Sequence, residues 1–397
     1  MPFCVRSKSF FIAAFAIAVV TLTSHQWAIA GGLVRAGAVG GVAIDAEGVL
    51  ANPEVGEPDR LMAAWQNGLD EVPQDLAKLS DLRFVSLKRI EAVLAKSSAD
   101  GLPVPDEVQL LAGLQRVKYV LVYPEQKDIL LAGPAEGWRV DSLGNVVGQT
   151  SGRPVLALDD FMVALRSALN QTGAGMSCSI DPTKEGLARV QRVASKLTAG
   201  DGPDRASKQI AQALGYQTIS VTGVPASSHF ARTMVAADFR MKRLAMNFEP
   251  APIDGLPSYL VLLGGRGGRG GMENMLPRWW LAPNYEPLLR DEKGLAWEIR
   301  GQGVKCLTEG DYVNSEGERK HSGKAGSAAQ QWADRFTEQF EELANHDSSF
   351  GHLRNAMDLA VATTLIVHEG LAENIGLELS QMAEKQELEE FNAPRQV

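Results

Sequence analysis

The chain has 397 residues, of which 45% are hydrophobic and 22% charged, so it is long enough for two or three domains with a sizeable core. Its formal net charge of −9 argues against general nucleic-acid binding, because that function needs a basic surface to neutralise phosphate groups.

The first thirty residues have the pattern of a secretory signal peptide. Arg6 and Lys8 form a positive start, residues 10–22 are apolar, and Ala28-Ile29-Ala30 is a small-x-small cleavage site. We therefore expect cleavage after Ala30 and export to the periplasm or the cell exterior, with an uncleaved anchor as the alternative. The apolar run is short for a permanent membrane span, and no later stretch resembles one.

The mature chain divides by composition into four regions. We expect an N-terminal α+β region, a central α/β region with a β-meander, a C-terminal helical region and an acidic tail, which is expected to be frayed. Their boundaries are 31–150, 151–310, 311–380 and 381–397, after the signal peptide at 1–30.

The N-terminal region is expected to hold two hairpins and short helices. Alternating apolar residues around turn formers predict the hairpins, and amphipathic spacing predicts the helices. The expected strands are within 42–50, at 118–122 and at 128–131, the expected helices are 61–69 and 87–95, and 133–152 is expected to be irregular.

Strands and helices alternate from residue 154 to residue 246, which predicts a mixed sheet with helices packed on it. Asp159 or Asp160 is expected to cap the first helix. The expected strands are 154–158, 176–180 and 216–222, and the expected helices are the one that this cap starts and that runs to residue 169, followed by 182–197 and 206–214.

Residues 223–250 are expected to form the inner layer of the fold. Ser227 or Ser228 is placed to cap a helix, and Asp238 and Lys242 are four residues apart and able to pair. Two apolar stripes run along opposite sides of this helix, so both sides need to be covered. The stripes are Phe230, Met234, Ala237, Met241 and Leu244 on one side, and Val235, Phe239 and Met246 on the other.

After residue 250 the sequence predicts short strands, loops and a final pair of helices. The glycine–arginine run at 264–271 satisfies a dinucleotide-binding pattern literally, but Pro277 stops any helix that would hold a phosphate, so a loop is expected. The expected elements are a strand at 259–263, a meander at 279–281, 286–289, 295–300 and 304–307, a loose segment at 314–326, and helices around 332–343 and 350–367.

The mature protein keeps two cysteines, Cys178 and Cys306, and buried free thiols are favoured over a disulfide. No metal site or cofactor is expected, because no two histidines have ligand spacing with an acidic partner. His368-Glu369 lacks the second histidine of a zincin, and no nucleophile elbow or P-loop is present.

Charged residues in apolar surroundings are the remaining site candidates. Asp238 and Arg240 flank the inner helix, and Glu286 follows an aromatic segment, Trp279 to Tyr285, that is able to line a sugar or peptide groove. Structural pairing and core packing are the simpler interpretations of these residues. Structural pairing is also the simpler interpretation of Arg354 and Asp358, four residues apart in the last helix. At Ser227-Ser228-His229, an anion site at the helix start is an alternative to simple capping.

Four segments, read together, resemble a family of secreted planctomycete proteins of unknown function, domain of unknown function 1598. The most distinctive is Val-Pro-Ala-Ser-Ser-His-Phe-Ala-Arg-Thr-Met-Val-Ala-Ala-Asp-Phe-Arg-Met-Lys, at 224–242. The others are 123–138, 152–160 and 297–308. The resemblance implies an exported or envelope location and brings no activity, cofactor or catalytic residue.

The sequence thus predicts an exported α+β protein. The favoured function is non-catalytic binding, or a structural role, in the cell envelope, with an unidentified envelope component or small ligand as partner. The alternative is a hydrolase acting on an envelope polysaccharide or peptide, with Asp238, Arg240 and Glu286 as site members.

Overall fold

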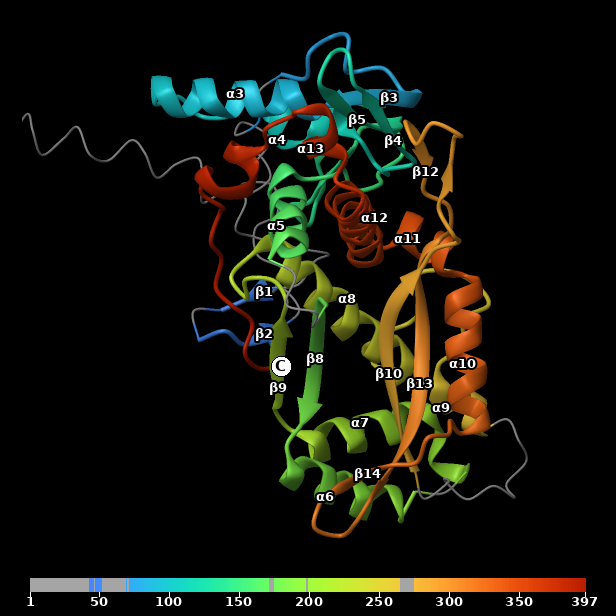
Figure 1. The fold of residues 1–397 in the computed structure, drawn as a ribbon. Coiled ribbons are helices and arrows are strands. Elements are labelled where there is room, and N and C mark those ends of the chain that lie inside the picture. The colour runs from blue at the N-terminus through green and yellow to red at the C-terminus, as the bar shows by residue number, and fades with distance from the viewer. Residues whose placement is uncertain are drawn as a thin grey trace, which may run out of the picture. The chain divides into compact units, whose positions relative to one another are not determined.

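The computed structural model describes residues 43–45, 47–51, 69, 71–170, 175–197, 199–264 and 275–397 (Figure 1), which belong to one unit of contacts. They combine helices with several antiparallel sheets, which confirms the predicted α+β class.

The described strands are short except for two. They are β1 (Ala43–Ile44), β2 (Leu50–Ala51), β3 (Ser80–Ser86), β4 (Tyr119–Tyr123), β5 (Asp128–Ala135), β6 (Trp138–Val140), β7 (Val146–Gly148), β8 (Ser177–Pro182), β9 (Gln217–Thr222), β10 (Met275–Asn284), β11 (Leu289–Arg290), β12 (Ala296–Glu298), β13 (Gly303–Val313) and β14 (Arg319–His321).

The described helices are α3 (Leu87–Asp100), α4 (Asp106–Gln109), α5 (Leu158–Leu169), α6 (Lys184–Ala194), α7 (Gly202–Leu214), α8 (His229–Ala245), α9 (Tyr259–Gly264), α10 (Ser327–Glu338), α11 (Phe340–His346), α12 (Ser348–His368) and α13 (Leu371–Ile375). Single turns add η1 (Leu111–Gly113), η2 (Ala199–Asp201) and η3 (Gln381–Lys385).

Helix α8 is covered on two sides, as its sequence predicts. Ser228 accepts a hydrogen bond from the N–H of Ala231 at 3.1 Å, which confirms the predicted cap. One apolar stripe joins the largest core cluster: Phe230, Met234, Ala237, Met241 and Leu244. The other stripe divides, since Val235 and Phe239 pack on strands β8 and β9 while Met246 is half-buried against neighbouring helices.

The strands beneath the second stripe form a mixed layer. β8 pairs with β9 and β1 with β2, both antiparallel. Residues 395–397 lie between the two pairs, because Gln396 bridges Thr218 of β9 in antiparallel fashion and Val49 beside β2 in parallel. The layer therefore has the order β1, β2, 395–397, β9, β8. It contains two of the strands predicted for the central sheet, at 176–180 and 216–222, whereas its other members were not predicted to belong to it.

The strands from β10 to β13 do not form the predicted meander. β10 and β13 pair with each other over ten residues, and β13 also pairs with β14. Between them, β11 and β12 form a hairpin that joins β4 in a separate sheet of order β11-β12-β4-β5-β3 (Figure 1). The long outer strands pair because a ten-residue ladder satisfies more backbone groups than short neighbours in sequence order.

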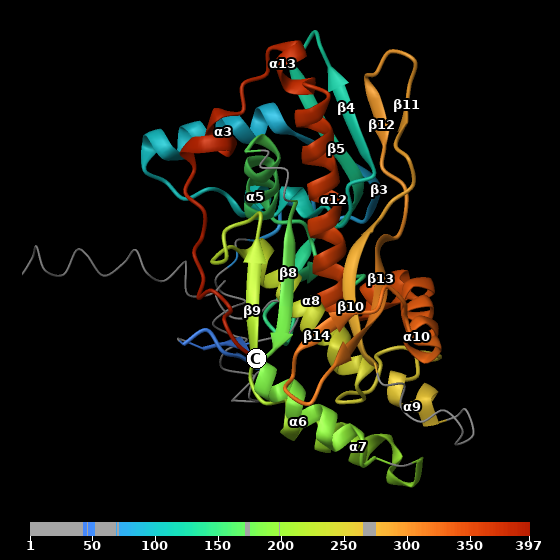
Figure 2. The ribbon, with the colours of Figure 1, turned by 60° about the horizontal axis from the view of Figure 1, so that its bottom comes forward.

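Helix α12 runs between these sheets and contacts α5, α8, α11 and β13 (Figure 2). It is buried on most sides, with Leu353, Ala356, Leu359 and Ala362 in the main core. The predicted final helical pair corresponds to α10 and α12, with the short α11 between them.

Several local predictions are wrong. Residues 259–263 form helix α9 rather than a strand, because a short apolar run does not distinguish the two and Ser258 accepts from the N–H of Val261 at 3.3 Å. Helix α5 follows Ala157 with no side-chain cap, so Asp159 and Asp160 lie in its first turn.

Other segments expected to be loose are ordered by long-range pairing. Residues 133–152 contain the β6–β7 hairpin, and 314–326 contain β14. Residues 154–158 hold no strand, only a bridge between Pro154 and Val147. The tail from residue 381 is not frayed, since it forms η3 and then enters the mixed layer.

The predicted signal peptide, all but the last residue of the helix expected at 61–69, and the glycine run from residue 265 lie outside the described residues. Among the helices that the structure describes, none combines the length and the apolar character required to cross a membrane.

Candidate functional site

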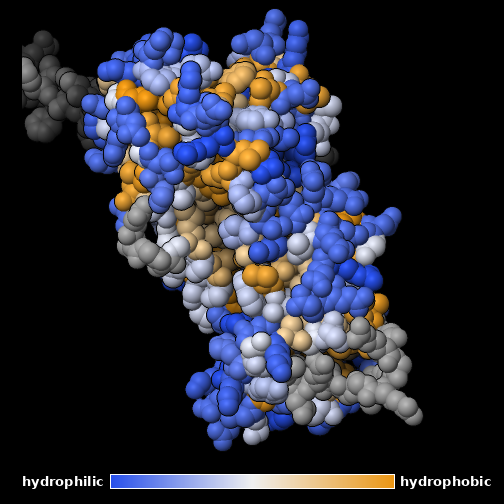
Figure 3. Space-filling model, turned by 45° about the vertical axis from the view of Figure 1, so that its right-hand side comes forward, coloured by the Kyte–Doolittle hydropathy of each residue, from blue (hydrophilic) through white to orange (hydrophobic). Residues whose placement is uncertain are grey.

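A cleft of about 1070 Å³ lies between β8 and β10, and we call it the central cleft. Consecutive residues of the two strands, 177–181 and 278–283, form its side walls, and helices α8 and α12 contribute its floor. The α12 residues in the cleft are mostly apolar: Leu353, Met357, Ala360, Val361 and Leu365. Figure 3 shows a recessed, mainly apolar area bordered by hydrophilic side chains. This size and lining are typical of binding sites, which measure about 300–1,000 Å³.

An ion pair on α8 supplies the polar part of the floor. The Lys242 Nζ lies 2.7 Å from the Asp238 Oδ2, which confirms the predicted pair, and also donates to the Ile180 carbonyl oxygen at 3.2 Å. Burial raises the pKa of the Asp238 carboxyl, and the Lys242 ammonium partly offsets this effect. The pair therefore joins α8 to β8 and leaves no separate charge on either side chain.

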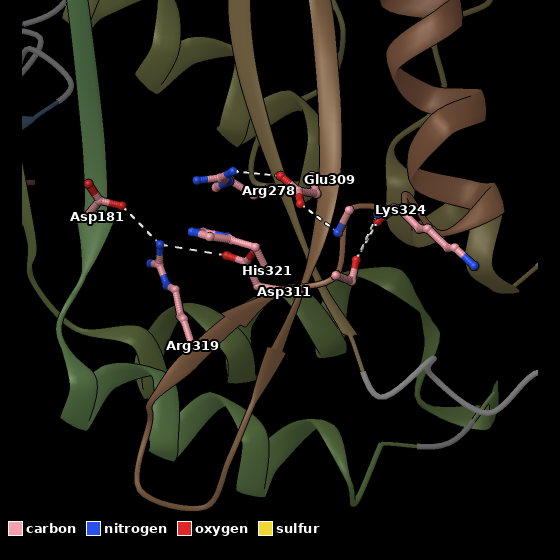
Figure 4. A network of polar contacts seen from close by, with 9 residues as sticks. Asp181, Arg278, Glu309, Asp311, Arg319, His321 and Lys324 are labelled. Carbon is pink, nitrogen blue, oxygen red and sulfur yellow. Dashed lines mark hydrogen bonds and ion pairs between the residues drawn. The ribbon is translucent and has the colours of Figure 1, made fainter.

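A network of charged residues closes the end of the cleft where β8 stops and β10 starts (Figure 4). Arg278 extends from β10 toward β8, and Arg319 lies between Asp181 of β8 and Asp311 of β13. The side-chain pairs in the network are Arg278–Glu309 at 2.9 Å, Arg319–Asp181 at 3.2 Å, Arg319–Asp311 at 3.9 Å and His321–Asp311 at 2.8 Å.

A second cavity of about 330 Å³ adjoins the central cleft. Its walls come from α6, α7 and α9, with apolar residues such as Val190, Ile210 and Leu260. Both cavities are lined by the same five residues at their junction: Ile180, Asp181, Lys242, Arg278 and Trp279.

The three site candidates from the sequence belong to three separate ion pairs. Only Asp238 among them lines the central cleft. Arg240 pairs with Glu249 and, at 2.8 Å, with Asp347. Glu286 pairs with Arg300 at 2.9 Å, and its side chain is 59% exposed. The structure therefore does not bring Asp238, Arg240 and Glu286 together in one cleft.

The charged residues of α12 also find partners on other elements. Asp358 is fully buried and accepts from Arg116 at 2.5 and 3.0 Å and from the Tyr285 hydroxyl at 2.7 Å. Arg354 donates to Asn345 at 3.3 Å. Asp358 thus joins α12 to the segment before β4 and to the end of β10, which is a structural role.

The aromatic segment divides between the core and the cleft. Trp279 is 5% exposed and makes edge contacts with Tyr259 and Trp332, so core packing accounts for much of its surface. Trp280 lines the cleft, and the Arg278 guanidinium lies 5.1 Å from its ring centre.

A histidine cluster at the start of α8 was not apparent from the sequence. The His229 Nδ1 lies 2.9 Å from the Asp160 carboxylate, and the His229 and His352 ring centres are 5.7 Å apart. Burial lowers the pKa of His229, but the Asp160 carboxylate outweighs it and the net pKa is raised. At the position of the predicted anion site, Ser228 caps α8 and His229 is already paired with the Asp160 carboxylate. Its partners lie on α5 and α12, so no local spacing signals the cluster.

Cys178 and Cys306 are free thiols, and Cys178 lines the central cleft. Burial raises the pKa of both thiols, so neither is an activated nucleophile.

No curated protein and no solved structure matches the chain. Residues 178–259, which run from β8 through α8 to the start of α9, match the family model described as "Protein of unknown function (DUF1598)". Over this segment the chain is therefore a match to domain of unknown function 1598, the family that its sequence resembles.

Proposed function

We propose that the protein is a non-catalytic binding component of the cell envelope, which holds an elongated and largely apolar ligand in the central cleft. The observation that carries this proposal is the cleft itself, with apolar residues of α12 on its floor and charges that are already paired. The pattern of residues 1–30 supports the export that the proposal requires.

A hydrolytic reaction has less support from the arrangement of the residues. Acid–base catalysis needs groups that reach one substrate, whereas Asp238, Arg240 and Glu286 belong to separate ion pairs. Asp238, the one member of the three in the cleft, is held by Lys242.

Filling the cleft tests the binding function. Ala360 is a half-buried residue of α12 that lines the cleft, and an indole at this position occupies ligand space. We expect wild-type protein to bind the neutral apolar dye Nile red with enhanced fluorescence, and Ala360→Trp to bind it at least about tenfold more weakly. Ala95→Trp, at an exposed position of α3, is the matched control. Equal dissociation constants for wild type and Ala360→Trp would contradict the proposal.

Export is tested separately by N-terminal sequencing of the protein expressed from its full sequence in a Gram-negative host. We expect the envelope fraction to contain a chain that starts at Gly31, and Ala30→Arg to block this cleavage because the position requires a small residue. An intact N-terminus on wild-type protein, recovered with the cytosol, would contradict export.

A further inference from the structure

The edge of β8 that faces away from β9 carries backbone groups directed into the central cleft. The N–H groups of Gln217 and Ile219 in β9 donate to residues 397 and 395, at 2.9 and 2.8 Å, and therefore point away from β8. Their partners in β8, Pro182 and Ile180, are thus in non-hydrogen-bonded pairs of the antiparallel ladder. By the alternation of the ladder, Cys178 and Ile180 direct their N–H and C=O groups outward.

The edge of β10 that faces away from β13 also carries backbone groups that point into the central cleft. The N–H of Gly310 donates to the Lys324 carbonyl oxygen at 2.7 Å, and that of Cys306 donates to the Thr337 hydroxyl at 2.9 Å. Both β13 residues therefore point away from β10. Their partners in β10 are residues 277 and 281, so alternate residues of β10 direct their backbone groups outward.

From residue 277 to residue 283, the outward residues of β10 are Pro277, Trp279, Leu281 and Pro283. Proline has no N–H and is tolerated where that group would face away from a ladder, which agrees with this assignment. The donors offered by β10 are thus the N–H groups of Trp279 and Leu281. Among the described residues, these groups and those of Cys178 and Ile180 form no backbone–backbone hydrogen bond outside their own ladders.

The two edges border the same space. Both views place β8 between β9 and β10, and β10 between β8 and β13 (Figures 1 and 2). The end of β8, at Ile180 and Asp181, and the start of β10, at Arg278 and Trp279, line the same junction, so the strands run in opposite directions. An intervening strand would be parallel to one of them and antiparallel to the other.

The volume of the cleft is sufficient for one strand. A strand as long as β8, which has six residues, spans about 20 Å, and the cleft has a volume of about 1070 Å³. A strand within a packed sheet occupies about 4.8 Å by 10 Å. The central cleft therefore has room for a single extended chain.

The chemistry of the cleft indicates which side chains such a chain carries. The α12 floor offers Met357, Val361 and Leu365 to alternate residues on one face. The charged residues that line the floor and the closed end, Asp238, Lys242, Arg278 and Asp181, each form an ion pair with a residue of opposite charge. Complementarity therefore favours an uncharged centre with apolar side chains at every second position.

We infer that the ligand of the central cleft is an extended polypeptide segment that inserts as a strand between β8 and β10 and joins their two sheets. This inference rests on the proposed binding function and specifies its ligand. Backbone hydrogen bonds to both edges give affinity, and pockets on the floor select the alternate apolar side chains. One acceptor on this edge, the Ile180 carbonyl oxygen, already accepts a hydrogen bond from the Lys242 ammonium. An N–H of the inserted strand would bond to this oxygen together with Lys242 or in its place.

The probe for this inference is a pool of fluorescein-labelled ten-residue peptides. They carry Val, Ile or Phe at even positions, Thr or Ser at odd positions and a lysine at each end. In two further pools the backbone nitrogens are methylated at even or at odd positions only, which removes the donors directed to one side of the strand. Binding is measured by fluorescence anisotropy, and we expect each methylated pool to bind at least about tenfold more weakly.

Two variants test the β8 edge from the side of the protein. Cys178→Pro removes an outward N–H without removing a ladder bond to β9, whereas Cys178→Ala keeps that N–H. Both variants lose the thiol. We therefore expect Cys178→Pro to bind the unmethylated pool several-fold more weakly than Cys178→Ala, with thermal unfolding measured on both to show that they are folded.

The outcomes separate this inference from the proposed function. Loss of affinity with both methylated pools supports insertion between two edges, whereas loss with one pool only would show docking on a single edge and would overturn the inference. If the peptides do not bind while Nile red binds and Ala360→Trp excludes it, the binding function stands and the polypeptide ligand is wrong. If neither probe binds, both are wrong.

Discussion

His352 is a titratable residue held in its neutral form by its surroundings. It lies on α12 with 8% of its surface exposed, and its ring is 5.7 Å from that of His229. Burial, and secondarily the charge on His229, lowers the pKa of His352 from its ordinary value of 6.5 to about 3. The unfolded chain therefore binds a proton at this residue between pH 6.5 and pH 3, and the folded chain does not.

This difference predicts an acid-sensitive stability. Because the unfolded state binds more protons, His352 contributes a loss of about 1.4 kcal/mol in unfolding free energy for each pH unit from about 6 down to 4. His229, whose pKa is raised beside Asp160, acts in the opposite direction. We expect His352→Leu to become progressively more stable relative to wild type over that range in urea unfolding. His346→Leu, at an exposed residue, is the control, and a pH-independent difference for His352→Leu would refute the assignment.

Single residues were predicted correctly where their partners are near in sequence. Ser228 caps α8 and Asp238 pairs with Lys242, because three- and four-residue spacings determine both contacts. Asp160 pairs with His229, 69 residues away, and Asp358 pairs with Arg116, 242 residues away. The sequence shows the charge in both cases, but the partner depends on how the helices pack.

At the scale of elements, α8 provides the sharpest test of packing. Val235 is fully buried against β8 and β9, on the side opposite the main core. Val235→Ala removes two buried methyl groups, so we expect a loss of about 2 kcal/mol in unfolding free energy by denaturant titration. Val261→Ala, on the exposed side of α9, is the matched control and is expected to change stability by less than about 0.5 kcal/mol. Equal losses of unfolding free energy for the two variants would mean that the stripe of α8 that contains Val235 is not buried.

Elements were predictable where periodicity alone decides them. The double stripe of α8 and the β4–β5 hairpin are local patterns, and both are present. Pairing between distant strands is not encoded in periodicity, so the β10–β13 ladder and the departure of β11–β12 to another sheet were missed. The central cleft depends on the packing of the β10–β13 pair beside β8, and periodicity does not show that arrangement, so the cleft was not found from the sequence.

At the scale of the whole molecule, the mixed layer connects the ends of the described chain. Leu50 donates its N–H to residue 396, and Asn392 bonds to Asp45 across 347 positions. Composition suggested a frayed acidic tail, because few apolar side chains are available there. Hydrogen bonds hold the tail instead: residues 395–397 pair through the main chain with β9 and with Gly48 and Leu50, and the Asn392 side chain adds a bond to Asp45.

The position of residues 395–397 between β2 and β9 has a consequence for the order of folding. Contacts between residues so far apart in sequence close very long loops, and closing such a loop has an entropic cost. We therefore expect these contacts to form after contacts between segments that are close in sequence. The β8–β9 pair and α8 all lie within residues 177–245, so we expect them to assemble before β1 and β2, which contact them through residues 395–397. We therefore expect the layer beneath α8 to be among the last parts of the protein to become complete, and its outer hairpin, β1–β2, to be among the first to detach when the protein opens.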